Sequence, residues 1–306
     1  MDNLITVYTP LYNRKDLLLR LYESLTFQTD LSFEWLICDD CSSDGSYELA
    51  KELAEKENRF LIRVIRTEHN GGKHRAINYG ITYAEGFLFY IVDSDDALPR
   101  DAIEKILAWE ETIRGKDSFA GLGFLKADLS LNNVGTTFPE QFCDCTSLER
   151  EEHNISGDKA EVIYTELFKK YPFPEFEGEK FLTEAVVWDR IAHDGHKIRW
   201  INEIAYLCEY QEDGLSANWE RNLANSPEGY ALLVKQKMNF KPCTGYDRFY
   251  MVYGYYYTIN LAKKYSMKFA CEKLDYPLVK AYLYMPIRKA KRIYSRLLDL
   301  LERKTK

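Results

Sequence analysis

Short apolar runs alternate with amphipathic stretches through the first hundred residues of this 306-residue chain. Short runs rich in Val, Ile, Leu, Phe and Tyr are typical of buried strands, whereas apolar residues that recur every three or four positions are typical of surface helices. The apolar runs predict four strands, at 4–9, 34–38, 60–66 and 87–92. The amphipathic stretches between them predict three helices, at 16–27, 46–56 and 73–84.

This alternation predicts βαβ units and therefore an α/β fold with a mainly parallel central sheet, right-handed crossovers and flanking helices. The carboxyl ends of parallel strands meet along one edge of such a sheet, and ligands bind in the crevice outside that edge. Polar residues that follow these strands directly are therefore the first candidates for a functional site.

The hydrophobic pattern weakens from about residue 120 to 158, where acids, Asn, Thr and Cys interrupt it, and this predicts a loop-rich insertion. Structured patterns return between 161 and 215. They predict a helix at 184–191 and short strands at 198–201 and 204–210.

Helical spacing of apolar residues dominates after Asn218, most clearly at 250–261 and 279–301. We therefore expect an α/β domain over residues 1–217 and a helical extension over residues 218–306.

Three acids follow the apolar run 88–92 directly, in the sequence Asp93-Ser94-Asp95-Asp96. At the end of a buried strand they repel one another unless a cation or a hydrogen-bonded ligand lies between them. Hard oxygen ligands suit Mg²⁺ or Mn²⁺, ions that are commonly shared with substrate phosphates. The pattern favours a divalent-metal site that holds a diphosphate. The alternative is an acidic turn before a helix that starts near Pro99 and Asp101.

Asp39 and Asp40 end the second predicted strand. A carboxylate there can accept hydrogen bonds from the imide N–H of a pyrimidine or from a ribose hydroxyl. The alternative is a capping role for the next helix, but Asp44 or Ser46 lies closer to its start. We expect Asp39 or Asp40 to contact a ligand.

The loop from Asn70 to Arg75 is glycine-rich and basic, and it leads into a predicted helix. Gly71 and Gly72 permit close backbone approach, and Lys73 adds charge at a helix N-terminus, so the loop resembles an anion-binding site in kind. It matches neither the dinucleotide-binding nor the P-loop pattern. A solvated basic turn is the alternative.

Four motifs occur in order: Thr9-Pro10-x-Tyr12-Asn13, Asp39-Asp40-x-Ser42-x-Asp44-Gly45, Asn70-x-Gly72 and Asp93-x-Asp95-Asp96. Their order and spacing resemble the family 2 glycosyltransferases, which have the GT-A fold. The resemblance covers roughly residues 3–215 and is most specific over the first 110. It implies a nucleotide-sugar donor, a divalent metal ion (Mn²⁺ or Mg²⁺) and a transfer that inverts the anomeric carbon.

By this resemblance, the loop from Pro10 to Asn13 and Asp40 would line the base and ribose site. Asp93 would reach the ribose or the metal, and Asp95 or Asp96 would ligate the metal. Together with the residues considered above, the expected donor-binding set is Pro10, Tyr12, Asn13, Asp39, Asp40, Asn70, Gly72, Lys73, Arg75, Asp93 and Ser94. The expected metal ligands are Asp93, Asp95 and Asp96.

The resemblance also implies a general base, an acid that lies a few residues before a Trp and an Arg near a helix start. Counting back from Arg190 places Glu184 at this position, where the family commonly carries Asp. Glu179 and Asp189 are the competing candidates. The alternative is that Glu184 only complements the helix N-terminus.

Composition and charge narrow the function classes. The net charge of −7 argues against a general nucleic-acid binder. The N-terminus lacks a signal-peptide pattern, and no apolar segment is long enough to span a membrane. The closest cysteine pair, Cys143-x-Cys145, fits no familiar zinc spacing, so we expect reduced thiols in a cytoplasmic protein.

The C-terminal segment 285–304 is basic and has apolar residues on one helical face. The pattern fits two interpretations, a helix docked on its own domain with a solvated basic face, or a peripheral contact with the inner face of the membrane. Family acceptors are often lipid-linked, so the membrane contact stays one of the two interpretations.

We therefore expect an inverting glycosyltransferase with a nucleotide-binding half over 1–115 and an acceptor half over 116–217. It would move a sugar from a UDP-sugar, the donor that the family favours, to a hydroxyl of a glycan or lipid-linked glycan in surface polysaccharide synthesis. The alternatives are a sugar nucleotidyltransferase and a non-catalytic nucleotide- or glycan-binding protein. The first of these usually has a Gly- and Arg-rich loop after its first strand, whereas the loop at 10–14 has no glycine.

Overall fold

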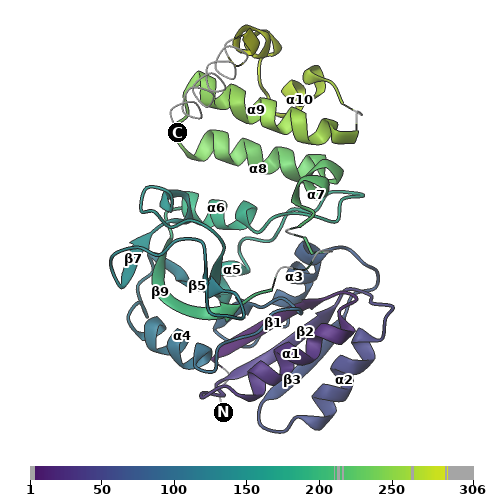
Figure 1. Cartoon of the computed structure of the whole chain (residues 1–306), viewed down its shortest axis with the longest axis vertical. Helices are drawn as coiled ribbons and strands as arrows, with labels where there is room; N and C mark the ends of the chain where they lie inside the picture. The colour runs from purple at the N-terminus through teal and green to yellow at the C-terminus, as the bar shows by residue number, and fades with distance from the viewer. Residues whose placement is uncertain are drawn as a thin grey trace, which may run out of the picture. The chain divides into compact units, whose positions relative to one another are not determined.

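The computed structural model describes residues 4–209, 211, 214–215, 217–262, 265–286 and 288. The chain divides into two compact units, Met1–Glu175 with Lys180–Ala217, and Phe176–Glu179 with Asn218–Lys306 (Figure 1). No helix within the described residues is long and apolar enough to cross a membrane. Most of the segment 285–304 lies outside the described residues, so the expected membrane contact stays a prediction.

The first unit is built on one sheet with the strand order β3-β2-β1-β4-β8-β5-β9-β7, and β6 pairs with β5. Strands β3, β2, β1 and β4 are parallel to one another, and β8 runs antiparallel to both β4 and β5. The expected α/β class is therefore confirmed, with a sheet that is mixed. The strands are β1 (Ile5–Leu11), β2 (Phe33–Asp39), β3 (Leu61–Arg66), β4 (Leu88–Ile91), β5 (Phe119–Ala127), β6 (Asn133–Val134), β7 (Phe142–Cys145), β8 (Lys159–Tyr164) and β9 (Lys197–Leu207).

Helices connect the parallel strands (Figure 1). In α1, the apolar residues Leu18, Leu21 and Leu25 recur at helical spacing and are fully buried in the same core cluster as Val7 and Trp35. The helices of this unit are α1 (Lys15–Thr26), α2 (Ser46–Lys56), α3 (Lys73–Ile81), α4 (Ala102–Glu111), the 3₁₀ turn η1 (Ser147–Glu149), α5 (Thr165–Phe168) and α6 (Ala185–His193).

The expected loop-rich insertion over 120–158 is wrong in part, because β5, β6, β7 and η1 lie there. Glycines interrupt the apolar pattern of β5 because neighbouring groups pack closely against the strand. A Cβ atom on Gly123 would lie 2.4 Å from the ring of Trp200, so the strand has space for this indole only where a side chain is missing.

The two short strands expected at 198–201 and 204–210 are one strand, β9. Asn202 and Glu203 interrupt the apolar pattern but stay in the strand because their side chains have partners. Asn202 donates to the carbonyl of Glu140 at 2.8 Å, and Glu203 accepts from the indole N–H of Trp109 at 3.0 Å.

The second unit is helical after Asn218, and one of its helices overlaps the helix expected at 250–261. Most of the helix expected at 279–301 lies outside the described residues. Its core joins α8 and α9 through Val234, Phe249 and Tyr255, among others. Its helices are α7 (Trp219–Asn225), α8 (Pro227–Phe240), α9 (Gly245–Ile259), the 3₁₀ turn η2 (Asn260–Ala262) and α10 (Met267–Lys273).

A buried carboxylate lies within the parallel half of the sheet. Glu34 of β2 is fully buried, and it accepts hydrogen bonds from Thr6 at 2.6 Å and from Arg63 Nε at 2.8 Å. It also accepts from the backbone N–H of Glu85 at 2.8 Å. A buried charge of this kind is tolerated because its partners replace water.

We predict that Arg63→Ala lowers the free energy of unfolding by about 3 kcal/mol, because it leaves the Glu34 carboxylate buried without its cation. Urea denaturation followed by circular dichroism measures the change. The control is Lys56→Ala, which removes an exposed pair with Glu52 and should change the free energy of unfolding by less than about 0.5 kcal/mol. Equal effects of the two substitutions would contradict the prediction.

Candidate active site

The loops that follow β1, β2, β3 and β4 open at one edge of the sheet, because the four strands are parallel and run toward the same edge. Leu11 and Asp39 are paired in register, and the N–H of Asp40 donates to the carbonyl of Leu11 at 2.7 Å. The N–H of Val92, after β4, donates to the carbonyl of Tyr8 at 2.8 Å. The edge predicted from the strand pattern is therefore present.

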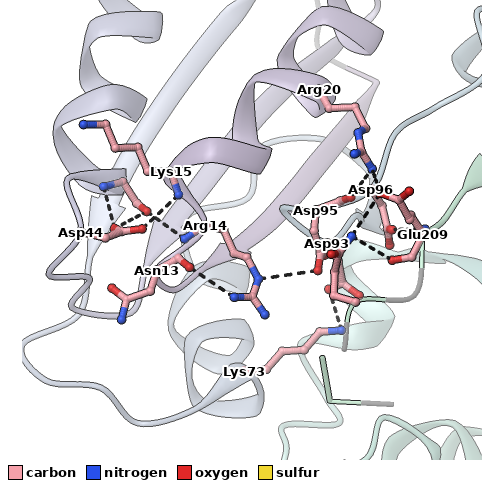
Figure 2. A network of polar contacts seen from close by, with 12 residues as sticks. Asn13, Arg14, Lys15, Arg20, Asp44, Lys73, Asp93, Asp95, Asp96 and Glu209 are labelled. Atoms are coloured by element: carbon pink, nitrogen blue, oxygen red, sulfur yellow. Dashed lines mark hydrogen bonds and ion pairs between the residues drawn. The ribbon is translucent and has the colours of Figure 1, made fainter. Parts of the chain in front are cut away.

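The loops after β1 and β2 are hydrogen-bonded to each other. Asn13 has a positive φ of 50°, and its side-chain oxygen accepts from the N–H of Ser43 at 2.9 Å. Asp44 accepts from the N–H groups of Lys15 at 3.1 Å and of Ser46 at 2.9 Å (Figure 2). Asp44 is thus the residue that supports the start of α2. These contacts order the loop and leave Tyr12 exposed next to Asn13.

Asp39 and Asp40 both shape the loops around them. Asp40 accepts from the N–H of Gly71 at 3.0 Å and of Gly72 at 2.7 Å. One oxygen of Asp39, Oδ2, faces Arg66 Nε at 3.1 Å. Its other oxygen, Oδ1, is buried without a hydrogen-bond partner among the residues that the structure describes. The expected contact of Asp39 or Asp40 with a ligand stays a prediction.

The glycine-rich loop before α3 is fastened to the segment that precedes Glu184. Gly72 has a φ of 92°, and a Cβ atom there would lie 2.0 Å from the carbonyl oxygen of Lys180. Asn70 accepts from the Lys180 ammonium at 2.7 Å. The group that packs closely against Gly72 is therefore the protein's own backbone. The N–H groups of Gly71 and Gly72 donate to Asp40, so an anion contact of this loop would depend on side-chain charge, and the expected contact stays a prediction.

Lys73 lies between two carboxylates from distant parts of the chain. Its ammonium nitrogen is 2.7 Å from Asp93 Oδ1 and 2.8 Å from Glu184 Oε1. Burial opposes its charge, but the two carboxylates raise the pKa of Lys73 above its usual value. Arg75, by contrast, pairs with Glu175 at 3.2 Å. We call Asp93, Asp95 and Asp96 the acid cluster. Of the two expected cations, Lys73 is the one that the described contacts place at this cluster.

Two arginines from α1 and the loop before it face the other acids. Arg14 Nε lies 3.6 Å from Asp95 Oδ2, and Arg20 donates to the backbone carbonyl of Asp95 at 3.3 Å. Arg20 also pairs with Glu209 at 2.8 Å (Figure 2). The three sequence-predicted acids are therefore close together, as expected, and basic side chains surround them.

Asp96 is buried, and both oxygens of its carboxylate accept hydrogen bonds from other groups of the protein. It accepts from the hydroxyl of Tyr206 at 2.6 Å and from the N–H of Glu209 at 3.1 Å. The same hydroxyl accepts from the N–H of Asp93 at 3.0 Å. Sequence reasoning missed Tyr206, because a Tyr in an apolar strand is indistinguishable from a core residue. Ser94 is also buried.

Burial and repulsion shift the pKa values of the acids. Burial, and then the charge of Asp93, raises the pKa of Asp96 to about 7 and also raises the pKa of Asp95. Burial opposes the charge of Asp93 too, but Lys73 and Lys126 hold its pKa below the usual value. A divalent cation would relieve this repulsion, and carboxylate oxygens are the ligands that Mg²⁺ and Mn²⁺ prefer.

The three candidate bases occupy different environments. Glu184 is the N-cap residue of α6, its side chain is 32% exposed, and it shares Lys73 with Asp93. Glu179 accepts from the N–H groups of Glu228 at 2.7 Å and Gly229 at 2.9 Å, so it supports the start of α8. Asp189 is buried within α6. Among the described contacts, Glu184 is the candidate joined to the acid cluster.

Comparisons with known proteins show the family to which the chain belongs. Residues 6–115 match the family described as Glycosyl transferase family 2. The chain is 34% identical over 240 residues to the glycosyltransferase GlyG of Streptococcus pneumoniae, covering 73% of this chain and 78% of that protein. It is also 34% identical over 250 residues to the chondroitin synthase of Pasteurella multocida, covering 80% of this chain but only 24% of that protein.

Two solved structures share the fold. S. aureus TarS 1-349 in complex with UDP has a TM-score of 0.58 and 19% identity, covering 87% of this chain and 74% of that one. The mannosyltransferase PcManGT from Pyrobaculum calidifontis, in complex with GDP-Man and Mn²⁺, has a TM-score of 0.56 and 15% identity, covering 96% and 85%. These likenesses confirm the expected GT-A architecture. On the strength of its match to the family and its identity with GlyG, the chain belongs to the family 2 glycosyltransferases.

Proposed function

We propose that the chain transfers a sugar from a nucleotide-diphosphate sugar to a hydroxyl of a glycan or lipid-linked glycan, with inversion at the anomeric carbon. The observation that carries the proposal is the shared position of Asp93 and Glu184, both within 2.8 Å of the Lys73 ammonium. A carboxylate for proton abstraction thus lies next to the acids suited to a metal and a diphosphate. Inverting transfer needs both groups at one site.

The proposed donor site lies along the loops after β1, β2 and β4. Tyr12 offers an exposed ring beside the ordered loop at Asn13, which suits a nucleobase. UDP is the proposed nucleotide, because TarS, which shares the fold, binds UDP. The similarity to a chondroitin synthase supports a glycan acceptor and a role in polysaccharide synthesis.

Asp95 is the proposed metal ligand, together with Asp93. Asp95 is only partly buried and faces Arg14 at 3.6 Å, whereas both oxygens of Asp96 accept hydrogen bonds from the protein. Asp96 would then hold Asp93 in place through Tyr206. A divalent cation at this site would neutralise the diphosphate leaving group.

Glu184 is the proposed general base. Its carboxylate would accept the proton of the acceptor hydroxyl while that oxygen attacks the anomeric carbon from the face opposite the diphosphate. In the structure, Lys73 pairs with this carboxylate. We propose that the diphosphate of the donor attracts the Lys73 ammonium and so releases Glu184 for proton transfer.

We predict that Glu184→Gln lowers kcat by about 10²- to 10⁴-fold, because the amide cannot accept the proton, while donor affinity does not fall. Release of the nucleoside diphosphate measures turnover, and calorimetry measures donor binding. The matched control is Glu175→Gln, an acid that pairs with Arg75 outside the acid cluster. Wild-type turnover in Glu184→Gln would move the base to another residue.

We predict that Asp95→Ala and Asp96→Ala separate metal binding from stability. With UDP and Mn²⁺ at about a hundredfold over Kd, the wild-type protein should gain about 2.7 kcal/mol of stability, and EDTA should remove the gain that depends on metal. Asp95→Ala should lose this metal-dependent gain and keep its basal stability. Asp96→Ala should cost about 2 kcal/mol of basal stability, because Tyr206 and Glu209 lose a buried acceptor. If both variants lost the metal-dependent gain equally and neither lost basal stability, the separate roles of Asp95 and Asp96 would be contradicted.

We predict that Lys73→Met raises the affinity for Mn²⁺ about tenfold in the absence of donor, because it removes a cation that competes for Asp93. The same variant should bind the donor more weakly and turn over more slowly, because the ammonium no longer meets the diphosphate. Calorimetry with Mn²⁺ alone, and then with UDP, measures both effects. Lys56→Met, on an exposed face of α2, should change neither affinity. Unchanged Mn²⁺ affinity in Lys73→Met would show that Lys73 and the metal do not share Asp93.

A further inference from the structure

Two cysteines lie side by side on the last strand in the sheet order. Cys143 and Cys145 belong to β7, which pairs with β9 at the end of the sheet (Figure 1). Residues two apart on a strand point to the same face, so the two thiols share one side of β7. Both are free thiols, Cys145 is buried and Cys143 is half-buried.

The turn after β7 brings an imidazole to these thiols. Thr146 and Glu149 form a capping box at η1, and the chain then turns back, with the N–H of Ile155 donating to the carbonyl of Arg150 at 2.8 Å. His153 lies in this turn and is exposed. A ring nitrogen of His153 and the sulfur atoms of Cys143 and Cys145 all lie within 4.8 Å of one another.

We propose that Cys143, Cys145 and His153 form a binding site for Zn²⁺. Two thiolates and an imidazole are the ligands that this ion prefers, whereas Mg²⁺ and Mn²⁺ prefer oxygen. Around a tetrahedral zinc ion, sulfur and nitrogen ligands lie about 3.5 to 3.8 Å apart, so the three side chains need to draw together only slightly. Water completes the fourth position.

Both thiols lie in surroundings that disfavour their charged form. Burial, and then the neighbouring Cys143, raises the pKa of Cys145 to about 12, and burial also raises the pKa of Cys143. Because zinc binds thiolates, binding of the ion would release the thiol protons.

Zinc at the proposed site would stabilise a segment that contacts α6, the helix that begins at the candidate base. Ser147, in the turn between Cys145 and His153, donates to the carbonyl of Trp188 at 2.9 Å. Trp188 lies in α6, and Glu184 is its N-cap residue. The ion would join β7 to this turn and so act on stability, since none of its three ligands belongs to the acid cluster around Asp93.

The test is a zinc titration of reduced, metal-free protein against a chromophoric chelator, with Co²⁺ as a spectroscopic probe of thiolate ligation. We expect one tight equivalent of Zn²⁺ and a rise in melting temperature. Cys143→Ser and Cys145→Ser should each weaken binding by at least about a hundredfold, and His153→Ala by at least about tenfold. Because Cys143 is half-buried and His153 is exposed, their variants should fold even if Cys145→Ser does not.

Two controls assign the bound zinc to its site. Cys243→Ser changes a half-buried thiol of the second unit, and Asp95→Ala changes the proposed Mn²⁺ site, and neither should alter the tight equivalent. Zinc binding that survives Cys143→Ser, or that only Asp95→Ala removes, would overturn the proposal. So would a reduced protein that binds no zinc but joins Cys143 and Cys145 in a disulfide on mild oxidation, because the pair would then be a redox pair.

Discussion

The ion pairs of Lys73 with Asp93 and Glu184 are the interaction on which the candidate site depends. They join the start of α3 and the end of β4, which follow one another in the chain, to the start of α6, which is distant from both in the sequence. Without a cation there, the carboxylates of Asp93 and Glu184 would face each other at the edge of the sheet, and each would disfavour the charge of the other. One ammonium therefore keeps a candidate base and a candidate metal ligand close together in the absence of substrate.

The same electrostatic constraint explains why adjacent acids have different environments. Tyr206 and the N–H of Glu209 satisfy the oxygens of Asp96, which is buried, whereas Asp95 keeps a partly exposed carboxylate near Arg14. A buried acid with hydrogen-bond donors positions the loop, and an accessible acid with a distant cation is suited to take a ligand. Asp95 and Asp96 look equivalent in the sequence, and only their surroundings separate them.

The parallel half of the fold is predictable from the sequence because local pattern and tertiary role agree there. Strand β2 is buried and mostly apolar, and Leu18, Leu21 and Leu25 form one helical face. The local pattern misleads where a residue is required by a partner that is distant in the sequence. In the sequence, Gly123 looks like an interruption of the strand, but the structure shows that it leaves space for Trp200. Gly72 looks like an anion contact, but the structure shows the carbonyl of Lys180 packed against it. Tyr206 is likewise meaningful only through its contact with Asp96.

The region from 120 to 158, which has the weakest sequence pattern, also bears on the candidate chemistry. Helix α6 carries Glu184 at its N-cap position, and Ser147 from this region donates to the carbonyl of Trp188 one turn further on. Lys73 thus contacts α6 at its start, while the turn after β7 contacts its first turns. A base must lie within about 3 Å of the proton that it accepts, so a small displacement of α6 would slow the reaction. The position of Glu184 therefore depends on residues whose sequence carries no catalytic motif.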